Sequence, residues 1–479
     1  MAPPPRVMGP NYRLGSETDG ARGREAPGLA VNPTNPQHIV EVDIDLLAQQ
    51  CRFNVSFDGG RTWTGGRLDV PPGFVPPCRS PAGTAYPAMD QSVAFGAGQN
   101  VYTTFSSIRG TEGDSILVAR SSDGGRSFGV PTVIIPGGPG GVPGNPFHTR
   151  PKLAVDRGAG PGGRDLVYVT AWGLGPPNRI ALTVASEDGG LTWAAPVAAS
   201  APDESAREQT QPVVGPDSSV YLVYRVAAFR TVGAVVLARS RDRGATWTRT
   251  KVRDIGDDPN LELAIDRRNG TLFLSYNETF DGDIDVMIQR STDGGVGWSE
   301  PLRINDDPRG LPVVQQLPHV TVAANGRVDM VWHDRRHAYR GGPFPACPYL
   351  QIGPFLCQGD TYYAFSVDGG RSFSPNKRIT DRTINLDVGF DRRLETYTSY
   401  SPVSVPIGDD AVLFAWADSR EGDFDDDNQD IYLARLEHRA SGPLPIGRVP
   451  EVRAPAFSAS VSQLAYPGGL EAVAGRPAP

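Results

Sequence analysis

The stretch Ser56-Phe57-Asp58-Gly59-Gly60-Arg61-Thr62-Trp63 decides the fold, because its pattern occurs six times along the chain. All copies read Ser-x-Asp-x-Gly-x-x-aromatic, and the other five begin at Ser121, Ser186, Ser240, Ser291 and Ser366. Aspartate and serine side chains hydrogen-bond the backbone of tight turns, and glycine adopts the positive φ that such turns need. We therefore interpret each copy as the turn of a β-hairpin.

The spacing of the copies indicates the size of the repeating unit. Successive copies begin 65, 65, 54, 51 and 75 residues apart. This period fits a four-stranded sheet with long loops, which is the unit of a β-propeller. Short segments with β-branched residues, such as 165–169 and 219–223, predict strands, and no stretch shows helical periodicity.

A second repeated pattern gives the number of units. Two short apolar segments separated by a turn precede each hairpin motif. A seventh pair (401–416) is followed by a third segment (430–435) but by no motif. A propeller has to close its ring, so we expect residues 7–14 to supply the missing outer strand. The sequence predicts an all-β propeller of seven four-stranded blades, with six blades as the alternative.

The repeats also set the domain boundaries. We expect residues 1–24 to form a lead that contains the closing strand, and residues 25–438 to form the propeller. Residues 439–479 are rich in proline, glycine and alanine and are expected to form a tail. The 56 glycines and 45 prolines among 479 residues suit a structure made largely of turns.

Charge and hydropathy exclude several classes of partner. The formal net charge of −8 argues against binding to nucleic acid or to anionic membranes. No run of about 18 apolar residues occurs, so no membrane-spanning helix is expected. An anionic ligand would therefore need a local group of basic side chains. We expect a monomer.

Four cysteines bear on the compartment. Closeness in sequence favours the disulfides Cys51–Cys78 and Cys347–Cys357, and four buried thiols are the alternative. The N-terminal Met-Ala-Pro-Pro-Pro has none of the apolar residues of a signal peptide. We expect an extracellular or periplasmic protein whose signal peptide is not present in this chain, with a cytoplasmic protein as the alternative.

The path of the chain through a propeller places the function on one face. If strand one of each blade runs away from a face, strand two returns to it, strand three leaves and strand four returns. The loops after strands two and four therefore share that face, which we call the mouth. The hairpin motifs, between strands three and four, lie on the opposite face. Loops on a rigid scaffold commonly carry function, so we expect the site at the mouth.

Over residues 24–436 the chain resembles the sialidase (neuraminidase) superfamily, in which the hairpin motif is known as the Asp box. The family uses an aspartate acid/base and a tyrosine nucleophile that a glutamate activates. Met89-Asp90-Gln91-Ser92 is similar to its catalytic aspartate segment, and Ser399-Tyr400-Ser401 to its Tyr-Ser signature. The resemblance implies that Asp90 is the acid/base, Tyr400 the nucleophile and Glu208 the base that takes the phenol proton.

The same resemblance implies that arginines bind the carboxylate of the substrate. Arg225 lies 17 residues after Glu208, in the position of the family's second arginine. The first arginine is represented by Arg24-Glu25-Ala26-Pro27, which departs from the family's Phe/Tyr-Arg-Ile-Pro motif. The candidate substrate-binding residues at the mouth are Arg24, Arg150, Arg225, Arg335 and Arg336.

We therefore expect a sialidase-like exo-glycosidase that hydrolyses terminal anionic sugars from glycoconjugates. Two alternatives stay open. A polysaccharide lyase acting on uronates would use His148 or His319, with a tyrosine, to abstract the proton beside the carboxylate. A non-catalytic glycan-binding or scaffold propeller would carry the fold without the chemistry.

No cofactor is required for this hydrolysis, but one acidic loop is a candidate metal site. Asp423, Asp425 and Asp427 lie close together in the seventh unit, and carboxylate oxygens are ligands that Ca²⁺ prefers. A structural calcium ion is one interpretation of this loop. An acidic loop exposed to solvent is the other.

Overall fold

The computed structural model describes most of the propeller apart from several loops and the two ends of the chain. The described residues are 6–14, 24–45, 50–74, 91–108, 114–137, 147–174, 179–207, 210–226, 232–256, 260–280, 283–310, 313–337, 358–385, 401–421 and 429–438.

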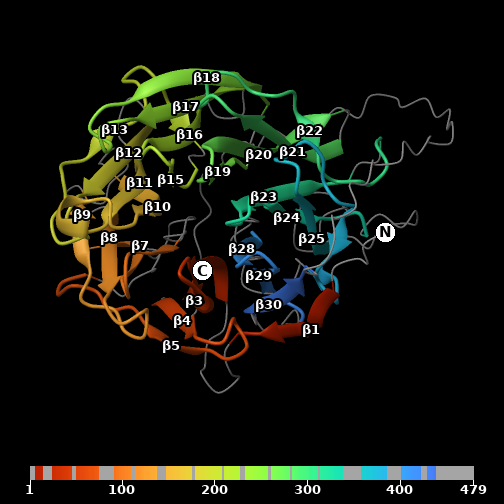
Figure 1. Cartoon of the computed structure of the whole chain (residues 1–479), viewed down its shortest axis with the longest axis horizontal. Helices are drawn as coiled ribbons and strands as arrows, with labels where there is room; N and C mark the ends of the chain where they lie inside the picture. Colours follow the sequence, from red (N-terminus) through yellow and green to blue (C-terminus); the bar gives the residue numbers. More distant parts are fainter. Residues whose placement is uncertain are drawn as a thin grey trace, which may run out of the picture. The chain divides into compact units, whose positions relative to one another are not determined.

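Seven antiparallel sheets form the blades of a β-propeller and follow one another around the ring in chain order (Figure 1). This confirms the prediction of seven blades. The strands of the first three blades, innermost first, are β2 (Arg24–Asn32), β3 (Asn35–Asp45), β4 (Gln50–Ser56) and β5 (Thr64–Arg67); β6 (Ser92–Phe95), β7 (Val101–Ile108), β8 (Asp114–Ser121) and β9 (Thr132–Ile135); and β10 (Phe147–Asp156), β11 (Leu166–Leu174), β12 (Arg179–Ser186) and β13 (Val197–Ala198).

Blades 4 and 6 each carry one additional two-residue strand. The strands of blades 4 to 6 are β14 (Ala206–Arg207), β15 (Val213–Val214), β16 (Val220–Val226), β17 (Gly233–Ser240) and β18 (Thr248–Ile255); β19 (Glu262–Asp266), β20 (Thr271–Phe280), β21 (Asp283–Ser291) and β22 (Leu302–Arg303); and β23 (Gln315–Val322), β24 (Val328–Asp334), β25 (Gln358–Ser366), β26 (Lys377–Arg378) and β27 (Ile384–Asn385).

The seventh blade joins the two ends of the propeller sequence. Its strands are β28 (Val403–Ile407), β29 (Ala411–Asp418), β30 (Asp430–Glu437) and, outermost, β1 (Arg6–Arg13). In Figure 1 the red β1 lies beside the blue β30. The backbone N–H of Leu14 continues the pairing by donating to the carbonyl of Ile431 at 2.8 Å. The predicted closure by the N-terminal strand is confirmed.

Apolar side chains of neighbouring blades pack together and form the cores between them. Val40 and Phe53 of blade 1, for example, pack in one cluster with Val101 and Phe105 of blade 2. Each such side chain contributes roughly 1.5–3 kcal/mol when fully buried. The ring is rigid for this reason, and it holds the loops at its two faces.

The Asp boxes connect strands three and four of six blades through one shared set of hydrogen bonds. In the first box, Ser56 Oγ donates to Asp58 Oδ1 at 2.8 Å and accepts the backbone N–H of Gly60 at 2.9 Å. Trp63 Nε1 donates to the carbonyl of Gly60 at 3.0 Å. Gly59 and Gly60 have φ of 73° and 84°, which explains the glycines of the motif.

Helical structure is almost absent from the part of the chain that the structure describes. It contains one short 3₁₀ turn, Pro161–Gly163, and no helix that is long and apolar enough to cross a membrane.

Candidate functional site

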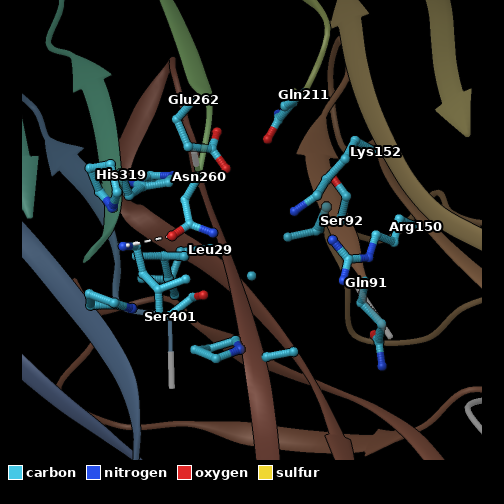
Figure 2. Close-up of a pocket in the computed structure, with 18 of the residues that line it drawn as sticks. Leu29, Gln91, Ser92, Arg150, Lys152, Gln211, Asn260, Glu262, His319 and Ser401 are labelled. Atoms are coloured by element: carbon cyan, nitrogen blue, oxygen red, sulfur yellow. Dashed lines mark hydrogen bonds between the residues drawn. The ribbon is translucent and has the colours of Figure 1, made fainter. Parts of the chain in front are cut away.

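A cavity of about 160 Å³ opens at the mouth, where the innermost strands begin (Figure 2). Every blade contributes to its wall, because the seven innermost strands surround the central channel. The polar and charged residues of the wall are Gln91, Ser92, Arg150, Lys152, Gln211, Asn260, Glu262, His319 and Ser401.

Blade 3 supplies the two basic side chains of this wall. Arg150 and Lys152 lie at the start of β10, where a β-bulge shifts the pairing with β11 between Thr149 and Lys152. The guanidinium of Arg150 lies over the ring of Trp172, with its Cζ 4.9 Å from the ring centroid. Such stacking fixes a cation while leaving its N–H groups able to bind an anion.

The bulge at Arg150 has counterparts in two other blades. Ala26, Arg150 and Leu317 have φ of 50°, 53° and 55°, and each precedes a proline at a bulge of its innermost strand. A positive φ costs a residue with a side chain about 1–2 kcal/mol. All three residues line the mouth cavity. Backbone strain of this kind concentrates at functional sites, where bulges re-aim side chains.

The charges of the wall favour an anion. Within the described ranges, no carboxylate lies within ion-pair distance of Lys152, which is half-buried and extends into the cavity from the side opposite His319 (Figure 2). Glu262, from β19, is the one carboxylate among the described residues of the wall. Two cations therefore face one anion.

His319, on β23, is held in one tautomer. Its Nδ1 accepts the backbone N–H of Ser404 in blade 7 at 3.2 Å, so the proton of the neutral ring lies on Nε2. Burial, together with the nearby Lys152, lowers the pKa of His319 to about 3. The imidazole is therefore neutral over the physiological pH range and can only donate at Nε2.

The channel continues from the mouth to a second cavity of about 540 Å³ toward the Asp-box face. Its wall is mainly apolar and includes Ala154, Leu263 and Val320. Gln211, Glu262 and His319 line both cavities and therefore lie at the junction between them.

Arg24 is buried away from the mouth cavity. It is 1% exposed, its Nε donates to Asp43 Oδ1 at 2.9 Å, and its guanidinium also bonds the carbonyl of Leu14. In this structure the side chain joins blade 1 to the closing seam of the ring. It does not line the cavity in which a substrate carboxylate is expected.

Two more predicted arginines are also buried outside this cavity. Arg225 lies near the end of β16, where its Cα faces that of Arg207, and it is 1% exposed. Arg335 follows β24, and its backbone N–H donates to the carbonyl of Val314 at 3.1 Å. Neither side chain belongs to the wall of the mouth cavity.

Arg336 belongs to a structural cluster that joins two blades. Trp332 Nε1 donates to Asp334 Oδ2 at 2.9 Å, and Arg336 Nε donates to Asp334 Oδ1 at 2.9 Å. Arg336 Nη1 then reaches Asp306 Oδ1 at 2.6 Å in the loop that leads from blade 5 to blade 6. Blade 7 repeats the arrangement with Trp416, Asp418, Arg420 and Asp381.

The three predicted catalytic residues, Asp90, Glu208 and Tyr400, lie outside the described residues. Their described neighbours in the chain line the mouth cavity. Gln91 directly follows Asp90, Ser401 directly follows Tyr400, and Gln211 follows Glu208 by three residues. Of the five predicted arginines, Arg150 alone contributes to the described wall.

The candidate calcium ligands Asp423, Asp425 and Asp427 lie outside the described residues, so the calcium site stays a prediction. The part of the chain that the structure describes contains no group of three histidine, cysteine, aspartate or glutamate side chains able to hold a metal. Cys51 is buried on β4. The other three cysteines lie outside the described ranges, and the disulfide pairing stays a prediction.

Sequence reasoning missed several residues of the wall, although a signal for them existed. Lys152, Gln211 and Glu262 are polar residues that each stand at the beginning of the first apolar segment of a repeat unit. Equivalent positions of successive blades meet around the channel. A comparison of these positions among the units would have pointed to them.

Comparison with known protein families agrees with the fold. The family model of the BNR repeat-like domain matches residues 99–330, which run from blade 2 to blade 6. The chain therefore carries a BNR repeat-like domain, and the resemblance to Asp-box propellers is confirmed at the level of the fold. No curated protein matches the chain in sequence.

Solved structures with the same fold have low sequence identity. A PL25 ulvan lyase has a TM-score of 0.53 and 11% identity, covering 89% of this chain and 96% of the lyase. A Hadza microbial sialidase has a TM-score of 0.43 and 13% identity, covering 88% and 68%. The GH93 α-L-arabinofuranosidase of Fusarium graminearum has a TM-score of 0.44 and 12% identity, covering 68% and 92%. At these identities the likeness establishes the propeller fold and leaves the activity open.

Proposed function

We propose that this propeller binds the terminal anionic sugar of a glycan in its mouth cavity and hydrolyses the glycosidic bond, as a sialidase-like exo-glycosidase. The observation that carries the proposal is the position of Lys152. Its ammonium group lies half-buried in the cavity wall and has no carboxylate partner among the described residues. A charge removed from water without a partner is costly, and a bound anion supplies the partner.

Arg150 complements Lys152 in this proposal. Its guanidinium presents planar donors that suit a carboxylate, and the ring of Trp172 supports it from below. The two basic residues then take the role that the family assigns to three arginines. Arg24 and Arg336 are already paired with Asp43 and Asp334.

The size of the cavity supports action on the end of a glycan. A volume of about 160 Å³ is below the roughly 300–1,000 Å³ of sites that enclose a drug-sized ligand. One sugar ring with its carboxylate would fill the space, and the remainder of the glycan would extend into solvent.

For the chemical step we propose the residues that the family resemblance implies. Glu208 would take the phenol proton of Tyr400, which attacks the anomeric carbon, and Asp90 would protonate the leaving oxygen. A neutral tyrosine avoids placing a second anion beside an anionic sugar. The positions of Gln91, Gln211 and Ser401 in the cavity wall support this assignment, because each lies within three residues of one of the three.

A fluorogenic sialoside, 4-methylumbelliferyl N-acetylneuraminide, tests the proposal. The chain is expected to release the fluorophore, and Tyr400→Phe and Asp90→Asn are expected to lose at least about 100-fold in kcat. Lys152→Met should raise KM, whereas Lys251→Met, at an exposed lysine of β18, should leave both constants unchanged. Full activity of Tyr400→Phe would contradict the mechanism.

The non-catalytic alternative gives a different result in the same experiment. Binding of N-acetylneuraminate that depends on Lys152, without release of the fluorophore, would show a glycan-binding propeller. A lyase would instead generate an unsaturated product from a uronate polymer. His319 does not suit the base of such a reaction, because its Nδ1 already accepts the N–H of Ser404.

A further inference from the structure

Gln211 is oriented by a hydrogen bond to a neighbouring blade. Its Nε2 donates to the carbonyl of Leu153, in β10 of blade 3, at 2.9 Å. This bond fixes which end of the amide faces away from blade 3. Over the described part of the chain, no group donates to Gln211 Oε1, and Figure 2 shows the side chain directed into the pocket. Gln211 therefore offers an acceptor to the channel.

His319 is oriented in the opposite sense. Its Nδ1 accepts the backbone N–H of Ser404 in blade 7, and the proton on Nε2 has no acceptor among the described residues. His319 therefore offers a donor to the same channel. Both side chains line the mouth cavity and the second cavity, so they lie where the channel leaves the mouth.

A neutral donor and a neutral acceptor, each fixed by a backbone group of an adjacent blade, suit hydroxyl groups. A sugar hydroxyl both donates and accepts, and it carries no charge that would need a counter-ion. Buried donors and acceptors that are left without a partner are costly, so a ligand that lacks hydroxyls is rejected.

We infer that Gln211 and His319 are specificity residues that hydrogen-bond the ring hydroxyls of a sugar acid whose carboxylate Lys152 and Arg150 hold. The inference rests on the proposed function, because it takes the anion site on blade 3 as given. It adds the orientation of the ligand: the carboxylate faces blade 3, and the hydroxyls point down the channel.

Two carboxylates that share a six-membered ring test this inference. D-Glucuronate carries hydroxyl groups, and cyclohexanecarboxylate carries none. Binding of each to the full chain is measured by calorimetry or by ligand-observed NMR. The wild-type chain is expected to bind glucuronate at least about tenfold more tightly than cyclohexanecarboxylate, which corresponds to one or two hydrogen bonds.

The variants separate the hydroxyl contacts from the anion contact. Gln211→Leu and His319→Phe should reduce the ratio of the two affinities to about one while leaving the binding of cyclohexanecarboxylate intact. Lys152→Met should weaken both ligands by a similar factor and preserve the ratio. Gln99→Leu, at an exposed glutamine beside the Asp box of blade 2, is the matched control and should change nothing.

The more conservative variants Gln211→Met and His319→Gln guard against loss of folding. His319→Gln keeps an N–H close to the position of Nε2 and should retain part of the preference for glucuronate. The inference is overturned if the wild-type chain binds both carboxylates equally, or if the preference survives in both Gln211→Met and His319→Phe. An unchanged affinity in Lys152→Met would overturn the anion site itself, and with it the proposed function.

Discussion

Thr62 donates its hydroxyl to Oδ2 of Asp58 at 2.6 Å, and its backbone N–H donates to Oδ1 of the same carboxylate at 2.9 Å. Ser56 and the backbone of Arg61 add two more hydrogen bonds. Burial alone would raise the pKa of Asp58, but these bonds, with Thr62 foremost, lower the pKa to about 2. The same shift to about 2 occurs at Asp123 and Asp188.

These shifts predict the acid stability of the propeller. The pKa of Asp58 is lower in the folded chain than the roughly 3.9 of an unfolded aspartate. Its contribution is therefore present above pH 4 and is lost as the pH falls toward 2. Urea unfolding between pH 5.5 and pH 2.5 should show a declining free energy of unfolding. Asp58→Asn should cost about 1–2 kcal/mol at pH 7 and show a shallower decline.

Asp283 predicts a dependence of the opposite sign at higher pH. Burial, and then the neighbouring Asp285 and Asp307, raise the pKa of Asp283 to about 7. The folded chain holds this proton more tightly than the unfolded chain, so stability should fall as the pH rises from about 4 to about 7. Asp283→Asn should increase the free energy of unfolding by about 2 kcal/mol at pH 8 and by little at pH 4.

The control for this prediction is Asp254→Asn, at an exposed aspartate that pairs with Lys251 on the outer strand β18. It should leave the pH dependence unchanged. A stability that does not vary between pH 4 and pH 8, in the wild-type chain and in Asp283→Asn alike, would contradict the prediction.

The fold could be predicted from the sequence because its signals are local. A Ser-x-Asp-x-Gly turn makes its hydrogen bonds within seven residues, so each Asp box is legible by itself. The absence of a box after residues 430–435 then required another outer strand, and the Val7 to Arg13 segment supplied it. These inferences needed no knowledge of distant contacts.

The cavity could not be predicted in the same way, because its wall is assembled from all seven blades. In the sequence, Arg24 and Arg150 are equally plausible as mouth arginines. Arg24 is paired with Asp43, 19 residues away, and is buried, whereas a bulge at positive φ turns Arg150 toward the cavity. Neither the pairing nor the bulge leaves a local pattern. The positions of polar residues at the start of β10, β15 and β19 become meaningful only when the units are superimposed.

The tryptophan–aspartate–arginine clusters of blades 6 and 7 predict a large loss of stability on substitution. Asp334 is fully buried and accepts hydrogen bonds from Trp332 and Arg336. Removing the carboxylate leaves the indole N–H unpaired and the guanidinium without its main partner. Asp334→Ala should cost about 3–5 kcal/mol in chemical unfolding. Asp217→Ala, at an exposed aspartate paired with Arg239, should cost about 1 kcal/mol or less.

Closure of the ring predicts the effect of shortening residue 14. Leu14 is 1% exposed and packs in the cluster that contains Trp416 and Leu433. Leu14→Ala should therefore cost about 2–5 kcal/mol through lost burial and the cavity that it leaves. Val232→Ala, at a 76% exposed residue, should change stability by less than about 0.5 kcal/mol. Equal midpoints for the two variants in thermal unfolding would show that β1 does not close the ring.

The strained position in blade 1 predicts an unusual response to glycine. Ala26 has φ of 50° and lines the mouth cavity, whereas Ala30 lies further along the same strand and has no positive φ. Glycine relieves about 1–2 kcal/mol of strain at Ala26 but costs about 0.5–1 kcal/mol of chain entropy at either position. Ala26→Gly should therefore be neutral or stabilising, and Ala30→Gly destabilising by about 1 kcal/mol, in matched urea titrations. If Ala26→Gly were as destabilising as Ala30→Gly, the positive φ at the mouth would not be a source of strain, and the bulges could no longer be regarded as features retained for the site.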